Sequence, residues 1–152
     1  KESTKTTGKP KPEKSATNKT VEVQQGQYVK YQNGIIYDKQ NGLEWFPGPD
    51  EDTTIKEAIQ WSSNLQVDGG NWRLPTEKEL KSLYNKNSGP RNMPALFDTT
   101  GWFLWTKNHY IHQAWPLAYA VNFHFGNTTK HKEKVKMKRH DLRAFAVRKK
   151  IR

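Results

Sequence analysis

The sequence predicts an α+β domain in which two short helices accompany a twisted antiparallel sheet. Strand candidates come first along the chain, two helical segments follow, and further strand candidates come after them. This order is typical of an α+β fold and differs from the alternation of βαβ units. Six tryptophans in 152 residues provide large side chains for a core, although hydrophobic residues make up only 33%. The low hydrophobicity is therefore expected to be concentrated outside the folded domain.

The first 20 residues form a basic and polar segment. They carry six Lys and two Glu, a net charge of +4, together with Pro10 and Pro12 and a single Ala as the apolar residue. Such a composition cannot bury enough surface to offset the entropy that ordering would cost. We expect residues 1–27 to be a disordered basic tail and residues 28–152 to form the domain.

A β-hairpin is expected directly after this tail. Short apolar runs lie at 35–38 and 43–46, and the dipeptide Asn41-Gly42 between them is a strong turn signal. The residues Pro47 to Pro49 then interrupt the second strand.

Two helices are predicted from their capping boxes, in which a Thr side chain and a Glu three residues later cap each other's backbone. The first helix is expected to begin at the box of Thr54 and Glu57 and to end at Asp68-Gly69-Gly70. Thr76 with Glu79 begins the second. Apolar residues at helical spacing follow each box, so each helix has one face for the core.

The later strands are predicted from apolar, aromatic or alternating runs bounded by turn residues. These runs lie at 102–106, 117–125, 130–138 and 142–148.

The charge of the chain is concentrated at its two ends. The formal net charge is +11, of which residues 21–129 contribute −2 and residues 130–152 contribute +9. A basic segment of this kind indicates a polyanionic partner such as nucleic acid, acidic polysaccharide or anionic lipid. The sequence has no apolar run near 18 residues, so it predicts no membrane span. It has no cysteine, which excludes disulfides, thiolate metal sites and a Cys nucleophile.

Every even position from Lys130 to Lys138 is Lys. In a strand these side chains would share one face, while Val135 and Met137 would face the other way. A linear polyanion could then lie along the lysines and release counterions. The alternative, which is compatible, is an edge strand that lysines protect against edge-to-edge pairing. The candidate polyanion-binding residues are Lys130, Lys132, Lys134, Lys136, Lys138, Arg139 and Arg143.

Several motifs together resemble the Lcl C-terminal domain family over about residues 34–148. The most specific is Trp72-Arg73-Leu74-Pro75-Thr76 with Glu79-Leu80, which is close to the "WRLPTxxEL" motif of the family. The other matching segments are Gly42-Leu43-Glu44-Trp45, Ile55 to Ile59, Phe103-Leu104-Trp105-Thr106, Ala120 to Phe123 with Gly126, and Ala146-Val147-Arg148.

This resemblance implies a C-type-lectin-like fold, similar also to formylglycine-generating enzymes, and an extracellular, cell-surface or periplasmic location in bacteria. The best understood member class is the C-terminal domain of a collagen-like adhesin that binds sulfated glycosaminoglycans. The chain departs from this pattern, since it has no collagen repeat, and Ser62, Ser63 and Ala146 stand near positions where members often have Cys. It also lacks the active-site cysteines of the formylglycine-generating enzymes and the sugar-binding motifs of calcium-dependent lectins, so the resemblance carries the fold and not their chemistry.

The remaining candidate residues have mostly structural explanations. In the WRLPT motif we expect Trp72 and Leu74 in the core and Arg73 holding a carboxylate or carbonyls. Tyr110 and Trp115 flank a loop and are candidates for stacking on a sugar, although most aromatic residues should be core. The five histidines show no zinc-site spacing, and no nucleophile elbow occurs, so we expect no metal site and no catalytic residues.

The sequence therefore predicts a non-enzymatic exported domain without a cofactor, which binds an acidic polysaccharide through a basic strand and acts in adhesion. The alternative is an accessory subunit of a surface appendage or envelope assembly, docked on an acidic protein. Nucleic-acid binding is disfavoured because no known module is present. Homo-oligomerisation is left open.

Overall fold

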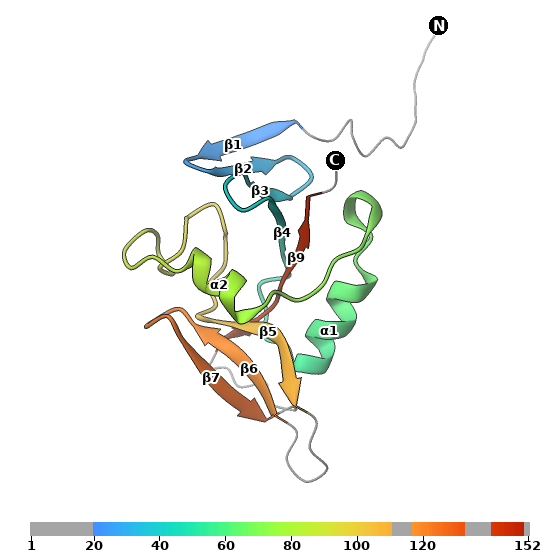
Figure 1. Cartoon of the computed structure of the whole chain (residues 1–152), viewed down its shortest axis with the longest axis vertical. Coiled ribbons are helices and arrows are strands. Elements are labelled where there is room, and N and C mark those ends of the chain that lie inside the picture. The colour runs from blue at the N-terminus through green and yellow to red at the C-terminus, as the bar shows by residue number, and fades with distance from the viewer. Residues whose placement is uncertain (1–19, 111–116, 133–140, 151–152) are drawn as a thin grey trace, which may run out of the picture.

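The computed structural model describes residues 20–110, 117–132 and 141–150, which form two sheets and two α-helices (Figure 1). A five-stranded sheet has the order β1-β2-β3-β4-β9, and a four-stranded sheet has the order β7-β6-β5-β8. The α-helices are α1 (Ile55–Asn64) and α2 (Glu77–Leu83), with a short 3-10 turn, η3, at Val67–Gly69. The strands are β1 (Val21–Gln25), β2 (Tyr28–Tyr31), β3 (Ile36–Asp38), β4 (Leu43–Pro47), β5 (Phe103–Tyr110), β6 (Leu117–Asn122), β7 (Asn127–Lys132), β8 (Leu142–Arg143) and β9 (Phe145–Lys149).

This architecture confirms an α+β domain with two short helices and differs from the expectation of a single antiparallel sheet. Nearly all paired strands are antiparallel, but β5 and β8 run parallel. The two sheets share one continuous segment, since β8 belongs to the four-stranded sheet and β9 to the five-stranded sheet. Within the described residues, no helix has the length and apolar character needed to cross a membrane.

The predicted hairpin at Asn41-Gly42 is confirmed, and Asp38 explains its stability. The Asp38 carboxylate accepts hydrogen bonds from the backbone N–H of Gln40 at 3.0 Å and of Asn41 at 3.1 Å. It also accepts one from the side-chain amide of Asn41 at 2.7 Å. Gly42 has a φ of +67°, a backbone conformation that glycine adopts without steric cost.

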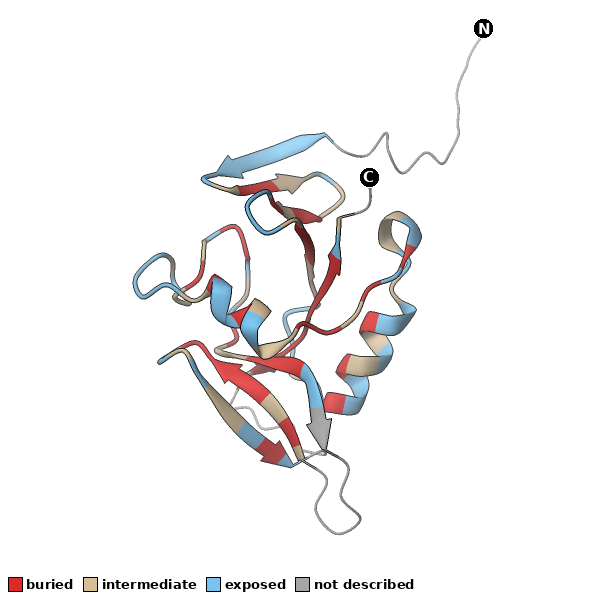
Figure 2. Cartoon of the chain, in the orientation of Figure 1, coloured by how far each residue is buried: buried red, intermediate tan, exposed pale blue. Residues whose placement is uncertain are grey.

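The predicted boundary of the tail at Gln27 is wrong, because β1 already pairs with β2. All five residues of β1 are exposed, so little burial holds the strand (Figure 2). Its order comes from the backbone ladder and from the turn at Gly26, where φ is +59°. A prediction based on hydrophobicity misses a strand held in this way. Residues 1–19 lie outside the described residues.

Both predicted capping boxes are present. The backbone N–H of Glu57 donates to Thr54 Oγ1 at 3.1 Å, and the Glu57 carboxylate accepts from the Thr54 N–H at 2.9 Å. The same pair of bonds joins Thr76 and Glu79 at 3.0 and 2.8 Å. Helix α1 ends at Asn64, earlier than the predicted glycines, because Leu65 is already extended.

The later strands have other bounds than the predicted runs. The run at 102–106 corresponds to β5, which continues to Tyr110. The run at 117–125 turns after Asn122, whose side-chain oxygen accepts the N–H of His124 at 2.8 Å. Residues 130–132 of the run at 130–138 belong to a strand that begins at Asn127, and residues 133–138 lie outside the described residues. The run at 142–148 divides at Ala144, because the chain passes there from one sheet to the other.

Aromatic side chains form much of the core, as the composition predicts. Trp45 and Trp105 are fully buried, one in each sheet. The Phe97 ring meets Trp45 edge-on at 5.9 Å between ring centroids and stacks with Phe145 at 5.9 Å. Large aromatic surfaces with these edge and stacked contacts stabilise the core.

The WRLPT segment has the predicted structural role. Trp72 and Leu74 are each 4% exposed. The Arg73 guanidinium donates two hydrogen bonds to the Glu79 carboxylate, both 2.8 Å long, so the arginine braces the carboxylate that caps α2. The Arg73 backbone forms an isolated antiparallel bridge with Val147 of β9. The segment therefore ties the start of α2 to the five-stranded sheet.

Arg148 of β9 is the second arginine that anchors this region. Its Nε lies 2.8 Å from Glu44 Oε1 on the neighbouring strand β4, and its Nη2 lies 2.8 Å from Asp68 Oδ2 in η3. The guanidinium also stacks over the Trp72 ring at 4.1 Å. The Glu44 side chain is 2% exposed, so this ion pair is shielded from water.

We expect Arg148→Met to lower the free energy of unfolding by about 3–5 kcal/mol, because Glu44 would remain buried without its main partner. Arg73→Met is the matched comparison, since Arg73 also pairs with a carboxylate but its side chain is 38% exposed. It should cost about 1 kcal/mol, as partly exposed ion pairs do. Urea unfolding of both variants measures the difference, and equal losses would contradict the role given to the burial of Glu44.

Candidate functional site

The candidate site is the face of β7 that carries lysines. β7 lies at the edge of the four-stranded sheet and pairs with β6 on its inner side. Lys130 and Lys132 are exposed, whereas His131 between them is 8% exposed. The alternation expected of a strand is therefore present in the described part of the basic run. Because β7 is an edge strand, its lysines can also protect it against edge-to-edge pairing, the alternative role given above.

His131 fixes which face of β7 the lysines occupy. Its Nε2 lies 2.7 Å from Thr129 Oγ1, in a hydrogen bond on the inner face of the same strand. Its ring meets Phe103 and Trp105 edge-on, at 5.7 and 5.6 Å between centroids. Because successive side chains alternate between the two faces, an inward His131 directs both neighbouring lysines outward.

The turn before β7 depends on a close backbone approach. Gly126 has a φ of +78°, and a Cβ there would lie 2.8 Å from the ring of Tyr84. Glycine alone avoids both the backbone strain and the clash. The hairpin between β6 and β7 thus packs against the end of α2. This packing positions the strand that carries the lysines.

An aromatic residue adjoins the lysines on the same face. Tyr119 of β6 pairs directly with Lys130, and Leu117 pairs directly with Lys132. Directly opposed residues of an antiparallel pair lie on one face of the sheet. Tyr119 and Leu117 are half-buried, so the face combines two ammonium groups with apolar surface. We call Lys130, Lys132 and Tyr119 the β7 lysine face.

Several predicted site residues lie outside the described residues. These are Lys134, Lys136, Lys138, Arg139 and Trp115, together with the side chain of Tyr110. Their roles stay predictions.

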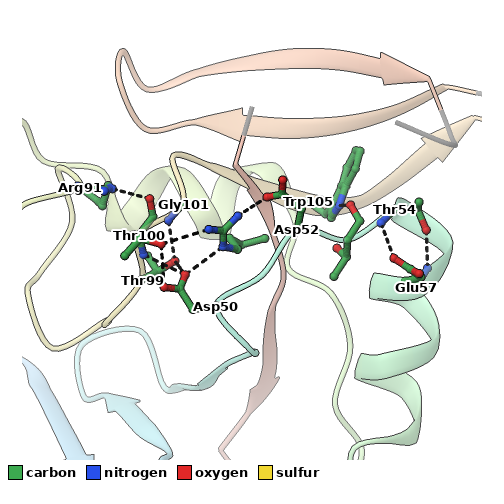
Figure 3. Close-up of polar contacts among 11 residues, drawn as sticks. Asp50, Asp52, Thr54, Glu57, Arg91, Thr99, Thr100, Gly101 and Trp105 are labelled. Atoms are coloured by element: carbon green, nitrogen blue, oxygen red, sulfur yellow. Dashed lines mark hydrogen bonds and ion pairs between the residues drawn. The ribbon is translucent and has the colours of Figure 1, made fainter. Parts of the chain in front are cut away.

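Arg143 does not belong to this face, although the sequence analysis grouped it with the lysines. Its side chain is 10% exposed and its Nε lies 3.0 Å from Asp50 Oδ1. Its Nη1 pairs with Asp52, and its Nη2 donates to Thr100 Oγ1 at 3.1 Å (Figure 3). Two carboxylates thus neutralise the guanidinium inside the protein, and it is not presented to a partner.

Asp50 is the centre of this network, a role that its position before α1 did not indicate. Thr99 Oγ1, the Thr100 N–H and Thr100 Oγ1 all donate to its carboxylate, at 3.1, 3.0 and 2.7 Å. Burial opposes the ionisation of Asp50, but these hydrogen bonds and that from Arg143 outweigh it and lower its pKa from 3.8 to about 2. The network therefore joins the loop before α1, the loop before β5 and the start of the shared segment.

The pKa of the Asp52 carboxyl shifts in the opposite direction, upward. Burial raises the pKa of its carboxyl, Arg143 lowers it, and the negative charge of Asp141 raises it again, with a net increase. Both aspartates stand just before α1, where acidic residues favour the positive end of the helix dipole. Their pairing with Arg143, 91 and 93 residues away, has no local signal in the sequence.

Among residues 20–110, 117–132 and 141–150, no three His, Asp or Glu side chains converge in a way that could hold a metal ion. The acidic pairs near the helix starts are engaged by cations, because Lys81 pairs with Glu77 at 2.7 Å and Arg73 pairs with Glu79.

Comparison with known proteins gives one finding. A family model described as the Lcl C-terminal domain matches residues 34–148. No curated protein and no solved structure shows a significant match to the chain.

We expect the Asp50 network to give stability that depends on acid pH. A carboxyl whose pKa falls on folding stabilises the protein above its unfolded value of 3.8, and this contribution is lost as the pH falls toward about 2. The carboxylate is 41% exposed, so after allowance for solvent screening the effect should be about 1 kcal/mol.

Urea unfolding of wild type and Asp50→Asn between pH 6 and pH 2 tests this. The stability difference should be largest above pH 4 and shrink toward pH 2. The matched control is Asp98→Asn at an exposed position, which should show no such trend. A difference between wild type and Asp50→Asn that stays constant with pH would contradict the expected role of the carboxylate.

Proposed function

Because the chain belongs to the Lcl C-terminal domain family, we propose that it is a non-enzymatic binding domain whose β7 lysine face recognises an acidic polysaccharide, sulfated or carboxylated. The observation that carries this proposal is the outward position of Lys130 and Lys132 on either side of the inward His131.

The spacing of the lysines supports a linear polymer as the ligand. Alternate residues of a strand lie roughly 6.8 Å apart, so Lys130 and Lys132 form the first step of a regular cationic row. The sequence continues this period through Lys134, Lys136 and Lys138. A polymer that places anions at regular intervals could occupy such a row, with affinity derived from counterion release.

The position of Tyr119 favours a sugar polymer over other polyanions. The ring belongs to a residue that directly opposes Lys130 and remains half-exposed. A flat aromatic surface beside cations suits a ligand that has both apolar ring faces and anionic groups. Tyr110 and Trp115 remain candidates for the same stacking role.

The absence of catalysis is part of the proposal. The carboxylate pairs that could have served as acid and base are held in ion pairs by Arg143, Lys81 and Arg73. We further propose that the fold is C-type-lectin-like and that the domain acts in adhesion at the bacterial surface or in the periplasm, as the resemblance to the family implies.

A second candidate function uses the same strand. β7 is an edge strand, so its lysines could dock on an acidic protein surface within an envelope assembly or appendage. In that case sugar binding would be absent.

We expect the double variant Lys130→Ser with Lys132→Ser to weaken heparin binding and to reduce the slope of log affinity against log salt concentration by about two, one for each ammonium removed. Changing Lys132, Lys134, Lys136 and Lys138 together to Ser should remove most of the slope. Isothermal titration across a salt series measures both effects.

The matched control is the double variant Lys39→Ser with Lys56→Ser, which removes the same charge from two exposed lysines elsewhere. It should leave the slope nearly unchanged. Duplex DNA serves as the comparison polymer and should bind at least about tenfold more weakly than heparin, a difference of about 1.4 kcal/mol. Equal binding of both polymers, or equal loss in both double variants, would overturn the polysaccharide proposal in favour of a protein partner.

A further inference from the structure

Phe125 is the most exposed large hydrophobic residue in the described part of the chain. It is 77% exposed, and the next such residue is 51% exposed. It lies in the turn between β6 and β7, where three backbone N–H groups donate to Asn122. His124 donates to the Asn122 side-chain oxygen at 2.8 Å, and Phe125 and Gly126 donate to its carbonyl at 3.3 and 2.7 Å. The fold thus holds an aromatic ring in water at a fixed position.

The Phe125 ring adjoins a cluster of aromatic and cationic side chains. Its centroid lies 6.0 Å from that of His124, and His124 stacks on Trp102 at 3.8 Å with an angle of 15° between the planes. The guanidinium of Arg91 lies over the Trp102 ring at 4.5 Å from the centroid, a cation–π contact. We call Arg91, Trp102, His124 and Phe125 the aromatic ledge. Its outermost members, His124 and Phe125, are exposed.

Arg91 gives the aromatic ledge a positive charge that no carboxylate neutralises within the described residues. Arg73, Arg143 and Arg148 each form an ion pair with a carboxylate, whereas Arg91 forms none there. Its Nε donates instead to the Thr100 carbonyl at 2.9 Å (Figure 3). A carbonyl orients the guanidinium and leaves its charge uncompensated, so the planar group can still pair with an anion of a ligand.

The surface beside the aromatic ledge is polar, which favours a sugar over a protein as its ligand. The loop of residues 85–92 contains no acidic residue and exposes the side chains of Asn85, Asn87 and Ser88. The side-chain amide of Asn92 joins this loop to the hairpin, since it donates to a backbone carbonyl there at 2.8 Å. A protein interface of standard size needs roughly 800 Å² on each partner with an apolar centre. One exposed ring among amides and a hydroxyl matches a sugar, whose ring has apolar faces and a hydroxylated edge.

We propose that the aromatic ledge is a second subsite for an acidic saccharide, in which Phe125 stacks on a sugar ring and Arg91 pairs with a carboxylate or sulfate. This inference rests on the proposed function and adds a contact of a different kind on the same hairpin. Phe125 and Lys130 are five residues apart, a separation of at most roughly 17 Å along the strand. A polysaccharide of several units can therefore reach the aromatic ledge and the β7 lysine face together. Duplex DNA cannot stack on Phe125 in this way, because its bases are already stacked on each other.

The salt dependence of heparin binding by Phe125→Ala tests the subsite. Stacking releases no counterions, so the affinity should fall by the same factor, roughly two- to tenfold, at every salt concentration, and the slope should not change. The variant that changes Lys130 and Lys132 to Ser should instead change the slope. Isothermal titration measures both quantities. The matched control is Val21→Ala, another exposed hydrophobic residue at the opposite end of the molecule (Figure 1), which should bind like the wild type.

The outcomes separate the two proposals. Unchanged affinity in Phe125→Ala, together with a reduced slope in the lysine variant, would overturn the aromatic ledge and leave the β7 lysine face in place. A wild type that does not bind heparin at low salt would overturn the proposed function and the aromatic ledge with it. Circular dichroism checks that each variant is folded, which the exposure of Phe125 leads us to expect.

Two other substitutions distinguish stacking from simple apolar contact. Phe125→Tyr keeps the flat ring and should bind heparin like the wild type. Phe125→Leu keeps an apolar side chain without a ring and should lose as much affinity as Phe125→Ala. Full binding by Phe125→Leu would contradict the stacking role.

Arg91→Gln tests the charge of the aromatic ledge. The slope of log affinity against log salt concentration should fall by about one, and Arg91→Lys, which keeps the charge, should restore it. A purely structural role of Arg91 would lower the melting temperature of both variants and leave the slope unchanged, which would overturn the assignment of Arg91 to the subsite.

Nuclear magnetic resonance locates the contact directly. Titration of the full chain with a heparin tetrasaccharide should shift the indole N–H resonance of Trp102 and the ring resonances of His124. Phe125→Ala should reduce these shifts, and a DNA duplex should not produce them. Shifts confined to residues of β6 and β7 around Lys130 would overturn the second subsite.

Discussion

The fold depends on the burial of two guanidinium groups in the segment Leu142–Lys149, which connects the two sheets. Arg143 lies where this segment leaves the four-stranded sheet, and Arg148 lies where it runs along β4. A buried cation is tolerated only when carboxylates and hydrogen bonds replace its water. Asp50 and Asp52 do so for the first arginine, and Glu44 and Asp68 do so for the second. The loop before α1, strand β4 and the turn η3, which carry these acids, are held in place by that requirement.

The burial of these two arginines also reduces the part of the basic charge that reaches the protein surface. A count of Lys and Arg near the C-terminus predicts one continuous basic surface, but two of those charges are internal and already neutralised. The surface charge of the described part of β7 comes from lysines alone. This division follows from the chemistry of the side chains, because a planar guanidinium can satisfy several acceptors in a buried site while an ammonium on a flexible stem stays hydrated.

The sequence predicts local features well, because each rests on residues close together in the chain. The capping boxes of Thr54 and Thr76, the turn at Asn41-Gly42 and the buried Trp72 are all confirmed. The errors concern pairing over long distances. The partner of Arg143 lies more than 90 residues away, and the run after Leu142 divides because it serves two sheets, neither of which a local pattern reveals.

In the candidate site, too, local patterns are predicted from the sequence, whereas contacts that depend on strand pairing are not. Period-two alternation predicted the outward lysines of β7, and the inward His131 agrees with it. Tyr119 was not among the candidate residues, and only the strand register places it opposite Lys130. The proximity of an aromatic ring to the lysines is thus a product of pairing between β6 and β7, which the composition of either strand alone does not specify.

The complete exposure of β1 has a consequence for how this domain can change over evolutionary time. Substitutions at surface positions away from caps and buried networks usually alter stability by less than about 0.5 kcal/mol. Each side chain of β1 is such a position, so mutations there are nearly invisible to selection for folding. A single change such as Val23→Lys alters the exposed surface of β1 and leaves the arginine network and the lysine face intact. Descendants of one ancestral domain can therefore differ widely in the sequence of β1 while they retain the same fold.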